Sequence, residues 1–228
     1  MVSPAPNTIW IASIDPGKNN FAFIVEEIRV EELKTLPKVL KKNRYEIDGT
    51  PSDEWSEFLT SLTKMGRTIV VENKNLTLKS ENKRKTLLDK EVFLSLTHVL
   101  DEYKKYWDHC SYILIEQQMS FGHKHNTMAI KIAQHTYSYF IFQYGPFKYL
   151  HEIPSYYKTQ VLGAEKGIDK PTRKKWSVIE ARKMWEARDD QVVISKLDKV
   201  RKRDDMSDCL LMTTAFVILR LVDGKEFE

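Results

Sequence analysis

Two apolar, β-rich runs separated by a tight turn open the chain and constrain its fold more than any other feature. The first run, IWIASI over Ile9–Ile14, ends at the turn-forming triplet Asp15-Pro16-Gly17. The second run, NFAFIVE, covers Asn20–Glu26. Because β-rich runs bounded by Pro, Gly and Asn are typical of strands, the pattern predicts a β-hairpin. A third strand is expected within Ile28–Thr35.

Helical and extended segments follow the hairpin and indicate an α/β fold. The expected helices cover residues 52–65, 87–107, 126–144, 171–188 and 207–221, and further strands or extended segments are expected at 67–72, 111–115 and 148–153. The chain has 228 residues, 42% of them hydrophobic, which suffices for one domain with a sizeable core. We expect a flexible arm over 1–8, a domain over 9–222 and a tail over 223–228.

Positive charge is concentrated in the last third of the chain. Residues 158–203 contain fourteen Lys or Arg and seven Asp or Glu, a local balance of +7, whereas the whole chain carries +4 and the remainder therefore −3. A basic segment in an otherwise acidic chain suggests a polyanionic partner. A solvated helix face with scattered ion pairs would produce the same pattern.

Several classes of protein are not indicated. The apolar stretch Cys209–Leu219 is interrupted by two Thr and is shorter than the roughly 20 residues that cross a bilayer. Met1–Thr8 lacks the basic and apolar regions of a secretory signal. The cysteines Cys110 and Cys209 are far apart and form no CxxC pair, which favours a reducing, intracellular compartment over a disulfide scaffold.

Carboxylates stand at four conspicuous positions. Asp15 closes the first apolar run, and Glu116 closes the run SYILI. Asp205 and Asp208 are three residues apart near the start of the last predicted helix, so they share a face. A carboxylate at the end of a buried strand is unfavourable unless it is hydrogen-bonded, paired or bound to a cation. Convergence of all four would favour Mg²⁺, which prefers such oxygen ligands.

Each of these acids also has an ordinary structural explanation. Asp15 in a DPG triplet is a common turn residue. Glu116 fits a strand-end ion pair, and the trio Asp204, Asp205 and Asp208 fits the first turn of a helix, where acids cap free N–H groups and meet the helix dipole. These explanations account for each acid singly but not for the combination of two strand-end acids with an acidic pair on a C-terminal helix.

The order of ASIDPGKNNFAF, ILIEQQ and DDMSD resembles the RuvC-type Holliday junction resolvases of the ribonuclease H-like superfamily. Within that group it most resembles the branch of poxviruses, other large DNA viruses and fungal mitochondria. Further similarity lies in the residues after Glu116-Gln117-Gln118, namely Asn126, Ala129, Lys131 and Gln134, and in Pro154, Lys158 and Gly163. The resemblance spans Ile9–Leu221, and residues 35–84 find no counterpart.

The resemblance implies a mixed five-stranded sheet flanked by helices, with an insertion after the third strand. It also implies an endodeoxyribonuclease that resolves four-way DNA junctions by paired symmetric nicks. Two Mg²⁺ ions per active site, with Mn²⁺ as an alternative, would support phosphodiester hydrolysis. The implied catalytic and metal-binding residues are Asp15, Glu116, Asp205 and Asp208, whereas Asp204 is expected to cap the helix.

The implied DNA contacts are mainly basic. Lys158 is expected to contact a phosphate near the metals, and the remaining cations to neutralise the DNA backbone. These cations are Lys170, Arg173, Lys174, Lys175, Lys199, Arg201, Lys202 and Arg203. Family members insert a loop side chain into the junction, for which Phe121 and Met119 are the candidates. Phe121 packed under its own loop is the alternative.

A four-way junction has approximate two-fold symmetry, and the resemblance implies a homodimer with two active sites. The predicted helix 126–144 is aromatic nearly all round, so one side could face the core and another a second subunit. No membrane association is expected. A viral source would place the protein at the viral replication site or in the host cytoplasm or nucleus, and Met1–Thr8 is too short and too poor in arginine for mitochondrial import.

Three other readings remain open. A ribonuclease H or transposase-type nuclease would share the fold. A catalytically inactive protein that binds branched DNA would share the scaffold. An actin-like nucleotide-binding protein also places a DxG hairpin against phosphate. This hypothesis predicts further glycine-rich phosphate loops, but the chain has only eight glycines.

Overall fold

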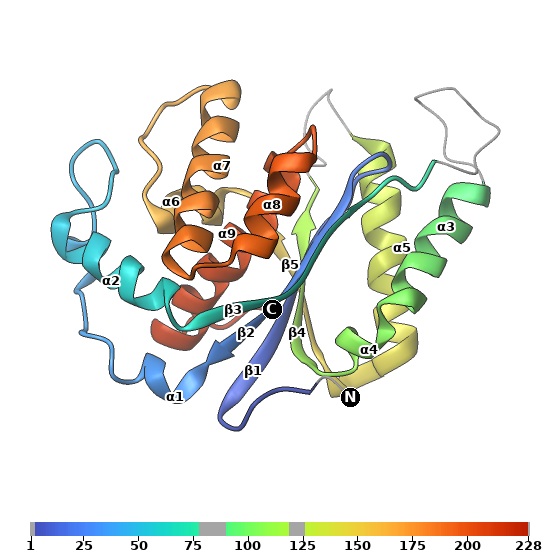
Figure 1. Ribbon diagram of the computed structural model, residues 1–228, viewed down its shortest axis with the longest axis horizontal. Helices are drawn as coiled ribbons and strands as arrows, with labels where there is room; N and C mark the ends of the chain where they lie inside the picture. The colour runs from blue at the N-terminus through green and yellow to red at the C-terminus, as the bar shows by residue number, and fades with distance from the viewer. Residues whose placement is uncertain (1–2, 78–89, 119–125, 228) are drawn as a thin grey trace.

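The computed structural model describes residues 3–77, 90–118 and 126–227 (Figure 1). Within these residues, five strands form one sheet of order β3-β2-β1-β4-β5. Strands β1, β2 and β3 are antiparallel neighbours, and β4 and β5 extend the sheet parallel to β1. The strands are β1 (Thr8–Asp15), β2 (Phe21–Arg29), β3 (Gly66–Lys74), β4 (Cys110–Gln117) and β5 (Tyr149–Pro154).

Helices cover both faces of this sheet (Figure 1). One face carries α2 (Asp53–Thr63), α6 (Tyr156–Leu162), α7 (Lys170–Ala187), α8 (Gln191–Lys199) and α9 (Asp204–Phe216), which continues as the π-helical segment η3 (Val217–Val222). The other carries α3 (Lys90–Glu102), α4 (Lys104–Trp107) and α5 (Thr127–Tyr144). Short turns α1 (Val30–Leu33), η1 (Lys41–Asn43) and η2 (Gly145–Phe147) join these elements. Among the helices described, none has the length and apolarity needed to span a membrane.

The central strands supply both cores by alternation. Ile11, Ala22 and Ile24 pack on the face of α9, whereas Trp10 and Phe23 pack on the face of α3 and α5. All five side chains are fully buried. Because successive side chains of a strand point to opposite faces, a strand covered on both sides must be apolar throughout. The hairpin predicted from the two apolar runs is confirmed as β1 and β2.

Helix α9 is buried along nearly its whole length. Residues 209–216 are all buried, so the helix lacks a polar face. The Thr213 hydroxyl lies 2.6 Å from the Ser13 hydroxyl of β1, and the Cys209 thiol donates to the Ala22 carbonyl of β2. These buried contacts hold the start of α9 at the end of the β1–β2 hairpin.

Two predicted boundaries are wrong. The third strand is not within Ile28–Thr35, because the chain turns at α1, where Lys34 pairs with Glu31 at helical spacing and Leu33 alone is buried. The third strand is β3, which lies inside the range 35–84. The last helix begins at Asp204 rather than at residue 207, and helix α8 was not predicted.

A buried ion pair joins the sheet to the end of α7. The Arg188 guanidinium donates to Glu26 at 2.6 Å, and the side chains are 7% and 0% exposed. The other Glu26 oxygen accepts from Thr68, which in turn accepts from the Trp185 indole. Removing one partner of a buried pair leaves an uncompensated charge, whose cost is far larger than the net stability of the intact pair.

We expect Arg188→Met to lower the free energy of unfolding by about 3–5 kcal/mol, because Glu26 stays buried without its cation. Arg182→Met is the matched control, since Arg182 of α7 pairs with exposed Glu186 of the same helix and with exposed Asp198 of α8. Urea unfolding followed by circular dichroism measures both. Equal midpoints for the two variants would contradict the role assigned to the pair.

Candidate active site

The ends of two parallel strands bring two of the predicted acids together. In the β1–β4 register Ile14 pairs with Ile115, so Asp15 and Glu116 follow at the same edge of the sheet. Figure 1 shows this edge at the top of the molecule, where β4 ends and the β1–β2 turn lies. Ligand sites of α/β sheets commonly form at such carboxyl ends.

The first turn of α9 adds the other two acids. Asp205 is 5% exposed and Asp208 is half-buried. Burial raises the pKa of the Asp15 carboxyl well above its usual range, and repulsion from Glu116, Asp205 and Asp208 raises it further. Four acids from β1, β4 and α9 therefore interact at one place, as the sequence predicted for these residue types.

Lys158 is the internal cation of this cluster. Its ammonium lies 3.0 Å from Oε1 of Glu116 and 2.6 Å from Oδ2 of Asp208, and its side chain is 9% exposed. Burial opposes the charge of Lys158, but attraction to Glu116 and Asp208 outweighs it and raises the lysine pKa. Lys158 is thus not the ordinary surface lysine that the sequence also allowed.

Helix α6 directs Lys158 inward and then stops. Lys158, Val161 and Leu162 form its buried face. Gly163 ends the helix with φ +80°, and a Cβ there would lie 2.6 Å from Pro51 Cγ, so only glycine fits. Each residue of the motif identified in the sequence has a structural role. Pro154 ends β5, Lys158 points inward from α6, and Gly163 ends that helix.

Two further lysines pair with the acids of α9. The ammonium of Lys202 lies 2.6 Å from both carboxylate oxygens of Asp205, three residues away. Lys174 of α7 pairs with Asp204, which points away from the cluster towards α7. These lysines were predicted to bind DNA, and their pairing with acids was not predicted, although the three-residue spacing of Lys202 and Asp205 was a readable signal.

The donor chemistry of the cluster suits a hard divalent cation. Asp208 Oδ1 is buried and has no hydrogen-bond partner within the described residues. In the present arrangement, however, no three His, Cys, Asp or Glu side chains of the described chain are placed to hold one metal ion. The ammonium of Lys158 lies between two of the carboxylates instead, which shows that they already bind a positive charge.

A cavity of about 340 Å³ opens at this cluster. Asp15 and Asp205 line it, together with the β1–β2 turn, Gln118, Lys202 and the N-terminal end of α5. Asn126 caps α5 as predicted, since its side chain accepts from the Ala129 N–H. The acids are therefore reachable from outside at the point where two strands end.

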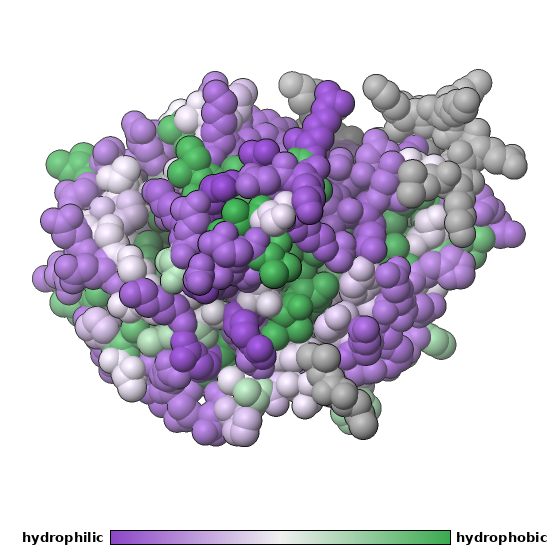
Figure 2. Space-filling model, viewed as in Figure 1, coloured by the Kyte–Doolittle hydropathy of each residue, from purple (hydrophilic) through white to green (hydrophobic). Residues whose placement is uncertain are grey.

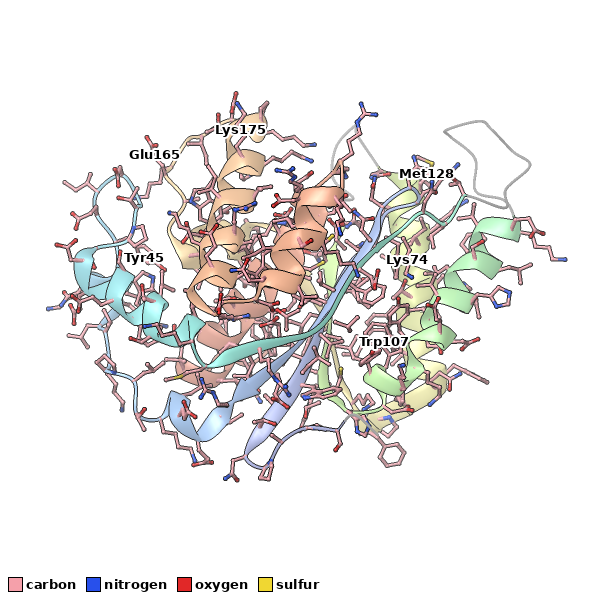
Figure 3. All side chains as sticks on the ribbon, viewed as in Figure 1. Tyr45, Lys74, Trp107, Met128, Glu165 and Lys175 are labelled. Atoms are coloured by element: carbon pink, nitrogen blue, oxygen red, sulfur yellow. The ribbon has the colours of Figure 1, made fainter. Side chains whose placement is uncertain are left out.

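Most of the predicted DNA contacts surround this edge. Figure 3 shows Lys175 at the N-terminal end of α7 and Met128 at the start of α5, both at the upper edge. Figure 2 shows that the surface around the end of α7 is hydrophilic. The exposed predicted cations are Lys170, Arg173, Lys175, Lys199, Arg201, Lys202 and Arg203, and Lys174 is half-buried. Phe121 and Met119 lie outside the described residues.

Comparisons with known proteins agree with this architecture. The chain is 33% identical over 239 residues to the uncharacterized protein 170L of Invertebrate iridescent virus 6, covering 94% of this chain and 91% of the relative. It is 28% identical to the uncharacterized protein 97L of Invertebrate iridescent virus 3, covering 90% of this chain and 98% of the relative. A scan against protein-family models finds no match.

Solved structures of RuvC from Thermus thermophilus have the same fold. RuvC itself gives a TM-score of 0.50 at 12% identity, covering 92% of this chain and 95% of that chain. RuvC in complex with a Holliday junction substrate gives a TM-score of 0.55 at 13% identity, covering 96% of this chain and all of the other. The predicted fold, a ribonuclease H-like mixed five-stranded sheet flanked by helices, is confirmed.

We expect Lys158→Met to lower the free energy of unfolding by about 3 kcal/mol in EDTA, because Glu116 and Asp208 lose the charge between them. The double variant Lys158→Met with Asp208→Asn should regain part of this loss, since it removes one of the unpaired charges. Chemical denaturation measures both. A double variant less stable than the single variant would show that carboxylate repulsion is not the cause.

Proposed function

We propose that the chain, which belongs to the family of the uncharacterized protein 170L of Invertebrate iridescent virus 6, is a metal-dependent endodeoxyribonuclease that resolves four-way DNA junctions. We place it in the branch of the RuvC-type resolvases that is found in poxviruses, other large DNA viruses and fungal mitochondria. The RuvC fold and the gathered carboxylates support this proposal, and the solved RuvC complex contains a Holliday junction substrate.

One observation carries the proposal. Asp15, Glu116, Asp205 and Asp208 come from three distant segments of the chain, yet repulsion from the other three raises the pKa of Asp15. A purely structural cluster of this kind would be destabilising, because like charges at short range repel. A site that accepts divalent cations accounts for the arrangement, since the cations remove the repulsion.

The residues that would hold Mg²⁺ or Mn²⁺ are Asp15, Glu116, Asp205 and Asp208. When bound, such ions supply Lewis-acid stabilisation and a more acidic water at the scissile phosphodiester. Lys158 holds Glu116 and Asp208 in place and adds positive charge beside the phosphate. The exposed cations of α7 and of residues 199–203 bind the DNA backbone, which positions the strand without reading its sequence.

The proposed active form is a homodimer, because symmetric junctions require two symmetric cuts. The apolar side chains that support it lie at the end of α5 and beyond it: Phe142 is 86% exposed, Phe147 90% and Tyr149 59%. The predicted aromatic face of α5 is only partly free, since Phe140 is buried in the core. Exposed large aromatic side chains are enriched at interfaces, and these three lie within eight residues of one another in the sequence.

We expect Asp15→Asn and Glu116→Gln each to reduce cleavage of a synthetic four-way junction by on the order of a thousandfold, since each removes a ligand charge that supports several kcal/mol of transition-state stabilisation. Junction binding should persist. Gel assays measure cleavage of the junction with and without Mg²⁺, with a linear duplex and an RNA–DNA hybrid as comparison substrates. Asp53→Asn is the control, because it makes the same acid-to-amide change outside the acid cluster.

Two outcomes would contradict the proposal. Undiminished cutting by Asp15→Asn would remove the acids from the chemistry. Faster cleavage of the RNA–DNA hybrid than of the junction by the unmodified chain would favour a ribonuclease H activity on the same fold.

We expect the chain to sediment as a dimer at micromolar concentration, and Phe142→Glu combined with Phe147→Glu to shift it to a monomer, because two charges would then lie in an apolar contact. Sedimentation velocity measures the shift. A strict monomer for the unmodified chain would refute the homodimer.

A further inference from the structure

A second cavity adjoins the one at the acid cluster. It has a volume of about 470 Å³ and is lined by Val200 and six polar residues, Asn19, Asn20, Asn73, Asn75, Arg201 and Lys202, which we call the amide groove. Asn19, Asn20 and Lys202 also line the cavity that contains Asp15 and Asp205. Because the two cavities share these residues, a polymeric ligand bound at the acids can extend into the amide groove.

The lining of the amide groove differs in charge from the acid cluster. Among the described residues that line it, none is a carboxylate, and two are cations. The amide groove therefore attracts an anion, whereas the neighbouring acids attract a cation. A ligand that carries a repeating negative charge and needs a metal at one position fits both.

Thr77 orients two of the amides. Its backbone N–H donates to Asn75 Oδ1 at 2.9 Å, and its hydroxyl lies 2.7 Å from that oxygen and 3.4 Å from Asn19 Oδ1. The amide oxygens are thus engaged within the protein, which leaves the N–H₂ groups to donate outward. Such donors match the oxygen acceptors of a phosphodiester.

The alternation of side chains along β3 places Asn73 on the face of the sheet that carries α9. The neighbouring Lys74 reaches the Tyr103 ring, 4.9 Å away, on the face of α3 (Figure 3). Asn73 must therefore point to the opposite face, where its amide approaches the Lys202 carbonyl at 3.5 Å. This long contact closes the amide groove between β3 and the segment that precedes α9.

We infer that the amide groove binds the sugar–phosphate backbone of the DNA strand next to the phosphodiester at the acid cluster. The inference rests on the proposed function, because it takes DNA to be the substrate. It adds a contact surface of asparagine donors to the predicted cations Arg201 and Lys202. Phosphate contacts of this type fix the position of a strand and so decide which phosphodiester reaches the acids.

The experiment is a binding measurement in EDTA, independent of cleavage. Fluorescence anisotropy with a labelled four-way junction compares the unmodified chain with Asn73→Asp and Asn75→Asp, which keep the side-chain shape but replace donors by negative charge. We expect each to weaken binding about tenfold through repulsion of phosphate. Asn43→Asp is the matched control, since Asn43 is exposed and lies outside the amide groove. It should weaken binding far less.

A second measurement locates the contact on the DNA. Junctions with single neutral methylphosphonates are scanned along one strand. For the unmodified chain, neutralising a phosphate next to the cut site should weaken binding, and this loss should disappear in Arg201→Gln, whose salt dependence should fall by about one unit of slope.

The outcomes separate the two proposals. Equal affinities for Asn73→Asp, Asn75→Asp and Asn43→Asp would overturn the amide groove while leaving the proposed function in place. A methylphosphonate profile identical in Arg201→Gln and the unmodified chain would do the same. Failure of the unmodified chain to bind any DNA would overturn both.

Discussion

Repulsion between carboxylates is the constraint around which this molecule is organised. Asp15, Glu116, Asp205 and Asp208 share a partly buried edge where solvent screens their charges poorly, and burial together with mutual repulsion raises the Asp15 pKa. Lys158 offsets part of this repulsion by contacting Glu116 and Asp208 at once. The positive charge that α6 places between two of the acids therefore helps the fold to hold them together.

The rest of the fold keeps that edge rigid. The parallel pairing of β1 with β4 places Asp15 beside Glu116, and the buried helix α9 carries the acidic pair to the same point. Helix α9 needs apolar surroundings on all sides, which α6, α7 and the β1–β2 face provide. The buried Glu26–Arg188 pair ties the end of α7 to the sheet. A catalytic arrangement built on strands and a packed helix is held more firmly than one built on loops.

The sequence predicted the acids and the fold class better than it predicted contacts. Apolar runs identified β1, β2 and β4, the three central strands of the sheet, because strands covered on both faces are apolar throughout. The edge strands were also expected, β3 as a strand or extended segment at 67–72 and β5 as a strand at 148–153, but β3 was not recognised as the third strand of the sheet, which was expected within Ile28–Thr35. Lys158 could be singled out by its motif, but its pairing with two acids depends on how α6 packs against α9, and no local pattern encodes that packing.

The distribution of charge along this edge is informative in itself. Carboxylates occupy its centre, where Lys158 pairs with Glu116 and Asp208 and Lys202 pairs with Asp205. Lys174 pairs with the neighbouring Asp204. Asparagine side chains lie farther out, at Asn19 and Asn20 on the β1–β2 turn and at Asn73 near the end of β3. A polyanion approaching this edge therefore meets amides and exposed cations first and reaches the acids only where a further cation offsets their charge. Binding of the DNA strand needs only the outer amides and exposed cations, which attract phosphate. Cleavage also needs the central acids, and these accept the strand only when a cation offsets their negative charge. Binding and cleavage can therefore be separated experimentally.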